Sequence, residues 1–222
     1  MIGENLQRIR ATLPEHVRLV AVSKTKPVED ILEAYRAGHR DFGENKVQEM
    51  VTKKEALPGD IRWHMIGHLQ TNKVKYIVPF VWLIHSVDSL KLLRTINKEA
   101  RKHDKVQEVL LEIHIAEEPS KFGFVFDDLS AMLREDEWRS LDHVRIRGVM
   151  GMATFTDDTE QVRREFAYLR SCFEKLKETF FAGDDRFTEI SMGMSGDYRI
   201  AVEEGSTIVR IGTLIFGERN YL

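Results

Sequence analysis

Two lysines near the N-terminus are the first residues in the sequence that could carry covalent chemistry. Lys24 and Lys26 follow the β-rich run Val17–Val22, and in an extended chain both side chains point the same way. A lysine at the inner end of a strand is partly desolvated, and a second cation nearby favours its neutral amine, which can attack a carbonyl group. The alternative is a pair of solvated lysines ahead of a helix that Pro27 caps.

Two runs of small residues in the last third of the chain form a candidate anion site. They are Ser191–Asp197 and Arg210–Thr213, in which Ser195 and Thr213 add hydroxyl donors to the backbone N–H groups. Loops of this composition ahead of helices bind anions. In a barrel of alternating strands and helices, the loops after the seventh and eighth strands are the usual phosphate site. The alternative is two tight turns without a ligand.

A lysine and a phosphate cradle at the same barrel mouth would suit a phosphorylated carbonyl compound. One candidate is pyridoxal 5′-phosphate (PLP), held as an aldimine on Lys24. The other is a sugar phosphate, held by a Schiff-base aldolase. The residue types alone leave both open.

Further polar residues follow the second strand-like run and lie within the third. Asn45 comes after Phe42-Gly43-Glu44 and could bind a ligand, although capping the next helix is the commoner use. His64 alternates with apolar residues, and most single histidines in strands have a structural role. The run Gly148–Ala153 predicts a close-packed apolar floor, which serves as core or as a surface for stacking a ring.

Strand-like and helix-like runs alternate from one end of the chain to the other. The expected strands are Val17–Val22, Arg40–Gly43, Ile61–Ile66, Val81–Val87, Val106–Ile115, Val144–Met152, Phe187–Met192 and Thr207–Ile211. The expected helices between them are Val28–Ala37, Val47–Leu57, Thr71–Val78, Ser89–His103, Asp127–Arg134, Thr159–Phe180 and Tyr198–Glu204. The pattern predicts an α/β fold, a single (β/α)8 TIM-like barrel domain over residues 1–222, with an extra N-terminal helix near Leu6–Leu13. A doubly wound open sheet is the alternative.

The composition is that of a globular protein with a sizeable core. Of the 222 residues, 42% are hydrophobic and 31% are charged, and the net charge is only −3. We therefore expect neither a nucleic-acid partner nor a membrane partner. A single cysteine, Cys172, the absence of a secretory signal and the absence of a long apolar run predict a cytoplasmic protein. No Cys/His cluster has the spacing of a metal site.

Five motifs carry a resemblance to a known family. The runs AVSKTKP, FGEN…VQE, HMIGHLQTNK, SMGMSGD and VRIGTLIFG occur in this order between Val20 and Gly217. Together they resemble the PLP homeostasis proteins, which are related to the N-terminal barrel of alanine racemase. The resemblance implies that Lys24 carries PLP. It also implies that Arg210 lies by the pyridine nitrogen, where a guanidinium weakens the ring as an electron sink because it cannot accept a proton.

The same resemblance implies further cofactor contacts. The phosphate would be held by small residues, namely Ser195, Gly196, Gly212 and Thr213. Asn45 matches an asparagine near the ring, and His64 matches the histidine that opens the third motif. Lys46 stands where many family members have tyrosine, so no contact is carried over for that side chain. The loop 117–123 also resembles the family, but no role is assigned to Lys121 within it.

The expected function is carriage of PLP without catalysis. Alanine racemase needs a second base from a further domain, and this sequence ends at Leu222, soon after the eighth strand, so we expect no such domain. The chain would buffer PLP in vitamin B6 homeostasis as a monomer and pass it to PLP-dependent apo-enzymes. A single-domain racemase-like enzyme or a Schiff-base aldolase is the alternative. A role of Lys26 in PLP transfer stays open.

Overall fold

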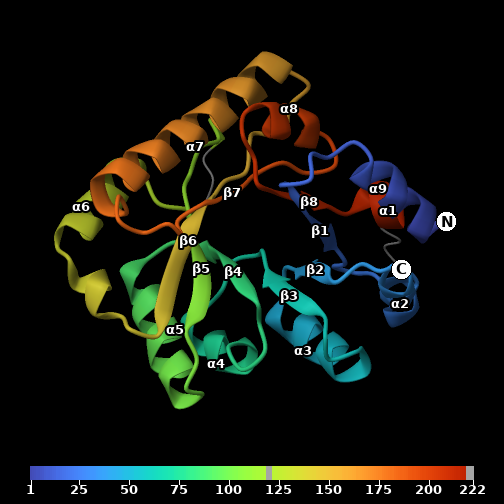
Figure 1. Cartoon of the computed structure of the whole chain (residues 1–222), viewed down its shortest axis with the longest axis horizontal. Coiled ribbons are helices and arrows are strands. Elements are labelled where there is room, and N and C mark those ends of the chain that lie inside the picture. Colours follow the sequence, from blue (N-terminus) through green and yellow to red (C-terminus); the bar gives the residue numbers. More distant parts are fainter. Residues whose placement is uncertain (119–121, 219–222) are drawn as a thin grey trace.

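Eight parallel strands follow one another around a closed barrel, in the order in which they occur in the sequence (Figure 1). The computed structural model describes residues 1–118 and 122–218 of the chain. The strands are β1 (Arg18–Val22), β2 (Asp41–Glu44), β3 (Arg62–Met65), β4 (Leu83–Val87), β5 (Gln107–Glu112), β6 (Val144–Met150), β7 (Glu189–Ser191) and β8 (Ile208–Ile211). The barrel closes where β8 pairs with β1. The expected barrel is confirmed, and the alternative of an open doubly wound sheet is wrong.

Helices surround the barrel and alternate with its strands (Figure 1). They are α1 (Ile2–Arg10), α2 (Val28–Arg36), α3 (Val47–Ala56), α4 (Val74–Ile77), α5 (Leu90–Lys102), α6 (Phe126–Arg134), α7 (Thr159–Phe180), α8 (Tyr198–Glu203) and α9 (Thr213–Phe216), with short 3-10 turns at Thr71–Lys73 and Glu137–Ser140. The extra N-terminal helix is α1, which begins four residues before the expected Leu6. Its buried residues, Ile2, Leu6 and Ile9, recur at helical spacing, and the helix packs against α2 and α9.

The interior of the barrel differs from the core between barrel and helices. Side chains alternate between the two faces of each strand, so the inward residues form a set of their own. Five of them make a small apolar cluster, which consists of Val20, Leu83, Leu110, Met150 and Ile208. Two residues further along β4 and β8, His85 and Arg210 are also buried. Buried polar side chains of this kind need hydrogen-bond partners within the protein.

Two glycines allow backbone segments to come unusually close. A Cβ atom on Gly148, whose φ is +154°, would overlap the carbonyl oxygen of Glu189 on the neighbouring strand β7. A Cβ atom on Gly67 would overlap the backbone of Asn45. Gly67 therefore lets the segment after β3 lie directly against the segment after β2, which holds Asn45 at the barrel mouth.

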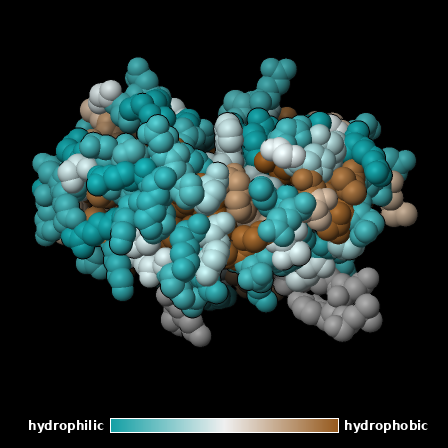
Figure 2. Space-filling model, turned by 90° about the horizontal axis from the view of Figure 1, so that it is seen from below, coloured by the Kyte–Doolittle hydropathy of each residue, from teal (hydrophilic) through white to brown (hydrophobic). Residues whose placement is uncertain are grey.

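The surface seen in Figure 2 is mainly hydrophilic, with apolar patches in the central and right-hand parts of the view. No helix in the described part of the chain has both the length and the apolar character needed to cross a membrane.

Candidate functional site

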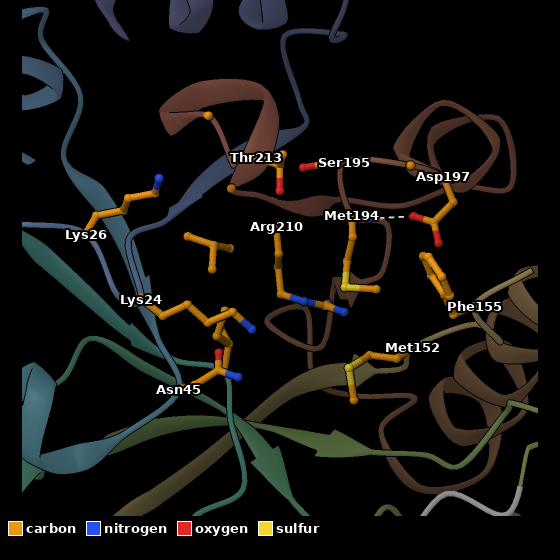
Figure 3. A pocket seen from close by; sticks show the side chains of 15 residues that line it. Lys24, Lys26, Asn45, Met152, Phe155, Met194, Ser195, Asp197, Arg210 and Thr213 are labelled. Carbon is orange, nitrogen blue, oxygen red and sulfur yellow. Dashed lines mark hydrogen bonds between the residues drawn. The ribbon is translucent and has the colours of Figure 1, made fainter. Parts of the chain in front are cut away.

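A cavity of about 320 Å³ opens at the carboxyl ends of the barrel strands. Seven of the eight residues singled out in the sequence line it, and His64 does not. The seven are Lys24, Asn45, Ser195, Gly196, Arg210, Gly212 and Thr213. They come from the segments after β1, β2 and β7 and from β8 and the segment after it, as the barrel rule for ligand sites requires. Figure 3 shows the Lys24 side chain extending into this cavity beside Asn45.

The backbone on both sides of Lys24 is held by a buried ionic cluster beneath it. Lys53 Nζ donates to the Ser23 carbonyl oxygen at 2.7 Å, to Glu44 Oε1 at 2.8 Å and to Glu49 Oε1 at 2.6 Å. The same Glu49 oxygen accepts from the Thr25 backbone N–H at 2.6 Å. Thr25 has a left-handed φ of 63°, which a β-branched residue adopts only when its surroundings enforce it. The cluster therefore fixes the segment that presents Lys24.

Glu44 is the least solvated member of this ionic cluster. Its side chain is fully buried, and burial raises the pKa of its carboxyl group although the Lys53 ammonium group opposes the shift. Glu44 Oε1 also accepts from the Ser23 hydroxyl at 2.6 Å, whereas Oε2 has no hydrogen-bond partner among the described residues. The charge of Lys53 thus offsets part of the cost of burying the Glu44 carboxylate.

Lys26 lines the same cavity, but its ammonium group is bound elsewhere. Lys26 Nζ donates to the Phe216 carbonyl oxygen at 3.1 Å and to the Glu218 carbonyl oxygen at 2.7 Å. Both acceptors lie at or just beyond the C-terminal end of α9, where carbonyl groups lack helical partners. Lys26 thereby ties the segment after β1 to the end of α9.

Two hydroxyl groups lie on the side of the cavity formed by the last two strand-end segments. They belong to Ser195 and Thr213, whose oxygen atoms are drawn near one another in Figure 3. The loop that carries Ser195 is held by Asp197, whose Oδ1 accepts from the Met194 backbone N–H at 2.6 Å. Burial raises the pKa of the Asp197 carboxyl group, and the Arg210 charge opposes that rise. This arrangement presents paired donors suited to an anion.

Apolar side chains complete the cavity wall. Met152 and Phe155 follow β6, and Met194 follows β7. Phe155 is 96% exposed, so its ring borders the opening to solvent. The glycine- and methionine-rich run at the end of β6 was expected to be either core or a ring-stacking surface, whereas Phe155, in a polar stretch, gave no such signal.

Arg210 is buried between the cavity and the barrel interior. Its Nη1 donates to the Ser191 hydroxyl at 2.6 Å, and its Nη2 donates to the Gly151 carbonyl oxygen at 3.1 Å. Burial lowers the pKa of Arg210 to about 10, with partial compensation from Asp197 and Glu112. The side chain is therefore still a cation at neutral pH.

A chain of hydrogen bonds runs from Arg210 through the barrel interior to Asp41. An arginine only donates and a carboxylate only accepts, so the two ends set the direction of every bond. Ser191 donates to His85 Nδ1 at 2.8 Å, and His85 Nε2 donates to His64 Nδ1 at 2.9 Å. His64 Nε2 then donates to Asp41 Oδ1 at 3.0 Å. Each histidine uses one N–H and one lone pair, which is the neutral form.

The electrostatics of this buried chain agree with neutral histidines. Burial lowers the pKa of His64 and lowers that of His85 well below its ordinary value. Burial opposes ionisation of Asp41, but its hydrogen bond with His64 and the nearby charge of Arg62 bring its pKa below the ordinary value. The chain therefore joins a cation and an anion through uncharged links.

His64 lies in this chain and not beside Lys24. His64 is completely buried, and it has the structural role that is usual for a histidine within a strand. Lys46, at the position where the family often has tyrosine, is exposed and is not among the residues that line the cavity. Lys121 lies outside the described residues.

Comparisons with known proteins agree with this geometry. The family model for the alanine racemase N-terminal domain matches residues 1–220. The chain is 42% identical over 205 residues to a pyridoxal phosphate homeostasis protein of Aquifex aeolicus, covering 92% of this chain and 88% of that one. It is 37% identical to the Homo sapiens protein of the same name over 235 aligned positions, covering 99% and 85% of the two chains.

Solved structures show the same fold. PipY of Synechococcus elongatus with PLP bound is 38% identical, has a TM-score of 0.89, and is matched over 98% of this chain and 100% of that chain. Alanine racemase of Clostridium difficile has a TM-score of 0.77 at 16% identity, and the match covers 98% of this chain and 55% of that one. The second likeness concerns the barrel fold alone.

Proposed function

Because the chain belongs to the alanine racemase N-terminal domain family, and within it to the pyridoxal phosphate homeostasis proteins, we propose that it binds PLP through Lys24 and holds it without turnover. When bound, PLP supplies a reactive aldehyde on an electron-withdrawing ring. The observation that carries the proposal is the cavity itself. A lysine on one side and two hydroxyl groups on the other match the two ends of PLP.

Each lining residue has a part in this proposal. The Lys24 amine condenses with the aldehyde and releases one water molecule. The phosphate is bound by the paired hydroxyl groups and the adjacent glycine amides, from Ser195, Gly196, Gly212 and Thr213. Asn45 lies beside the ring, and Met152 and Met194 give it apolar contacts. Since Lys26 is held by two carbonyl oxygens, Lys24 is the residue we assign to the aldehyde.

Arg210 favours holding the cofactor over catalysis. Beside a bound ring, its guanidinium would donate to the pyridine nitrogen and could not accept a proton, so it would leave the ring unprotonated and weakly electron-withdrawing. The other titratable lining groups among the described residues are Lys26, held by carbonyl oxygens, and Asp197, which accepts from the Met194 N–H. Because both groups are engaged in contacts within the protein, we assign neither of them as a second base. This supports carriage of PLP over catalysis.

We also propose that the loaded chain acts as a monomer in the cytoplasm and passes PLP to apo-enzymes. The cavity opens to solvent beside Phe155, which supports exchange with a recipient. The single cysteine, Cys172, is buried and fits a reducing compartment.

Absorbance and mass spectrometry test the proposal. Purified protein mixed with PLP should develop a visible absorbance band that borohydride abolishes, and the reduced product should carry the added mass on the Lys24 peptide. Lys24→Ala should lack the band, while Lys26→Ala, which removes the same charge from the same cavity, should retain it. A band that survives in Lys24→Ala contradicts the assignment. Turnover of an amino acid at about 1 s⁻¹ or faster contradicts the non-catalytic part.

A further inference from the structure

A second cavity, of about 480 Å³, lies at the opposite end of the barrel. Arg18, Asp41 and Arg62 are the first residues of β1, β2 and β3, and all three line it. At the other end of β1, Val22 lines the cavity that contains Lys24. Arg18 and Val22 are four residue steps apart along the strand, which is roughly 13 Å. We call this second cavity the amino-end pocket.

Cations dominate the amino-end pocket. Arginine side chains reach it from α1, β1, the segment before β2, and β3, and they are Arg10, Arg18, Arg40 and Arg62. Two of these charges are matched within the protein, because Arg40 pairs with Asp60 at 2.8 Å and Arg62 pairs with Asp41 at 2.6 Å. Among the described residues, Arg10 and Arg18 make no ion pair, not even with Glu15, the other carboxylate that lines the pocket.

Arg10 is oriented without being neutralised. Its Nη2 donates at 2.7 Å to His39 Nδ1, while His39 Nε2 donates at 2.8 Å to the Asp41 carbonyl oxygen. Burial, with the Arg10 charge adding to it, lowers the pKa of His39 to about 4. His39 is therefore uncharged at neutral pH, and it holds the Arg10 guanidinium in place while leaving its positive charge unmatched.

Arg18 and Arg62 present donors that have no acceptor. In residues 1–118 and 122–218, the half-buried Arg18 side chain makes no hydrogen bond or ion pair. Arg62 Nε is buried and likewise lacks a hydrogen-bond partner within that part of the chain. Guanidinium N–H groups removed from water without an acceptor are costly, so the arrangement favours an acceptor from outside the chain.

We propose that the amino-end pocket binds a small phosphate-bearing anion, with Arg18 and Arg10 as its main ligands and Arg62 Nε as a further donor. Two unmatched cations call for a dianion. The donors come from separate strand and helix ends, and a phosphate group offers three oxygen atoms in different directions, whereas the planar fork of each arginine takes two of them. The site is distinct from the one proposed for PLP and does not depend on it.

Calorimetric titration with inorganic phosphate and pyrophosphate tests this proposal. The protein is used loaded with PLP and reduced with borohydride, so that the hydroxyl groups near Lys24 are already occupied. We expect one anion per chain, with a Kd of about 1 mM or tighter. Arg18→Ala and Arg10→Ala should each weaken binding by roughly tenfold or more, since a charge-assisted contact of this kind contributes at least that factor.

Two comparison variants and a check of folding accompany these titrations. Arg36→Ala removes the same charge from an exposed position on α2 outside the pocket and should leave the affinity unchanged. Arg18→Lys keeps the charge without the planar fork and should bind more tightly than Arg18→Ala but less tightly than the parent. Circular dichroism melts of each variant confirm folding.

Equal affinity in the parent, Arg18→Ala and Arg10→Ala would overturn the proposal, as would an absence of binding at millimolar anion. Malonate bound as tightly as phosphate would overturn the assignment to phosphate chemistry. If the protein fails to take up PLP, the same titrations on the unloaded chain still compare Arg18→Ala with Arg36→Ala, so failure of the cofactor proposal is seen separately.

Discussion

Arg210 Nη1 donates a 2.6 Å hydrogen bond to the Ser191 hydroxyl group, and that hydroxyl in turn donates a hydrogen bond to His85. Ser191 is fully buried, and its contact fixes one end of the guanidinium while the Gly151 carbonyl oxygen fixes the other. Arg210 is therefore held at two points. Its position in the cavity is set by strand β7 and by the buried chain behind it, and not by solvent.

Ser191→Ala tests whether this contact positions Arg210 against the cofactor. The variant leaves Arg210 Nη1 and His85 Nδ1 without their partner, which destabilises the fold by about 1–3 kcal/mol. If Arg210 contacts the ring, the visible band of bound PLP should also shift, and PLP should bind several-fold more weakly. Spectra and PLP titrations measure both effects.

Ser206→Ala is the matched control for Ser191→Ala. Ser206 is also fully buried, and its hydroxyl group is bonded to the carbonyl oxygens of Met192 at 2.7 Å and Ile208 at 2.9 Å. It should lower the melting temperature without moving the PLP band. If both variants lose stability and neither changes the spectrum, Ser191 has a structural role only.

His64 and His85, like the buried His39, predict that the protein loses stability in mild acid. His64 and His85 have folded-state pKa values below the ordinary value, mainly because of burial, so the unfolded chain binds more protons below about pH 6.5. Their contribution is complete above that pH and is lost as the pH falls. Each adds a slope of up to about 1.4 kcal/mol per pH unit. Urea unfolding at intervals from pH 7.5 to 5 should show this slope.

Replacing one histidine distinguishes its contribution to the pH dependence of stability from that of the carboxyl groups, which also titrate. His85→Gln keeps a donor and an acceptor but does not titrate, so the variant should be less stable than the parent at pH 7.5 and should lose less stability on going to pH 5. A replacement of the exposed His16 should leave the slope unchanged. An unchanged slope in His85→Gln would falsify the assignment of a neutral buried His85.

Glu112 predicts the opposite pH dependence. Burial raises the pKa of this carboxyl group to about 7, Asp88 adds to the shift, and Arg210 opposes it. Its protonated form stabilises the fold, so this contribution is present below about pH 4.5 and is lost as the pH rises through about 7. Glu112→Gln should therefore gain stability over the parent between pH 5 and pH 8, by up to about 3 kcal/mol.

Chemical denaturation at pH 5 and pH 8 measures that gain. Glu108→Gln is the comparison on the same strand, because Glu108 is ion-paired with Arg147 at 2.7 Å and its replacement should bring no gain at pH 8. Equal stability of Glu112→Gln and the parent at both pH values would mean that Glu112 is ionised without penalty.

The sequence was sufficient for the barrel and for the residues at its mouth. Strand and helix periods are local properties, and motifs at strand ends in a barrel converge at one face whatever the details of register. Lys24, Ser195 and Thr213 could therefore be placed together from their neighbours in sequence, and the structure does bring them to one cavity.

The buried chain behind Arg210 could not be found in the same way. Its members come from β2, β3, β4, β7 and β8, and whether they touch depends on the stagger between strands, which periodicity does not determine. The family resemblance carried His64 over as a cofactor contact, whereas the structure has it outside the cavity, with His85 as its partner. The burial of Lys53 could not be predicted from the sequence either, because a lysine on a helix is usually exposed. Its burial follows from its ion pair with Glu44.

Glu49→Ala tests whether the ionic cluster beneath Lys24 positions that lysine. Glu49 Oε1 accepts from both the Thr25 N–H and Lys53 Nζ, each at 2.6 Å. Without this oxygen, the left-handed Thr25 loses its restraint and the segment that carries Lys24 gains freedom. We expect the visible band to form several-fold more slowly on mixing with PLP, and the apparent Kd for PLP to rise.

Stopped-flow absorbance measures the rate, and denaturation measures the stability. Because the Glu49 side chain is 24% exposed and Lys53 keeps Glu44 as a partner, the loss of stability should stay near 1–2 kcal/mol. Glu55→Ala, an exposed glutamate on the same helix, should match the parent in both rate and affinity. If Glu49→Ala forms the band at the parent rate and with the parent affinity, the cluster stabilises the fold without orienting Lys24.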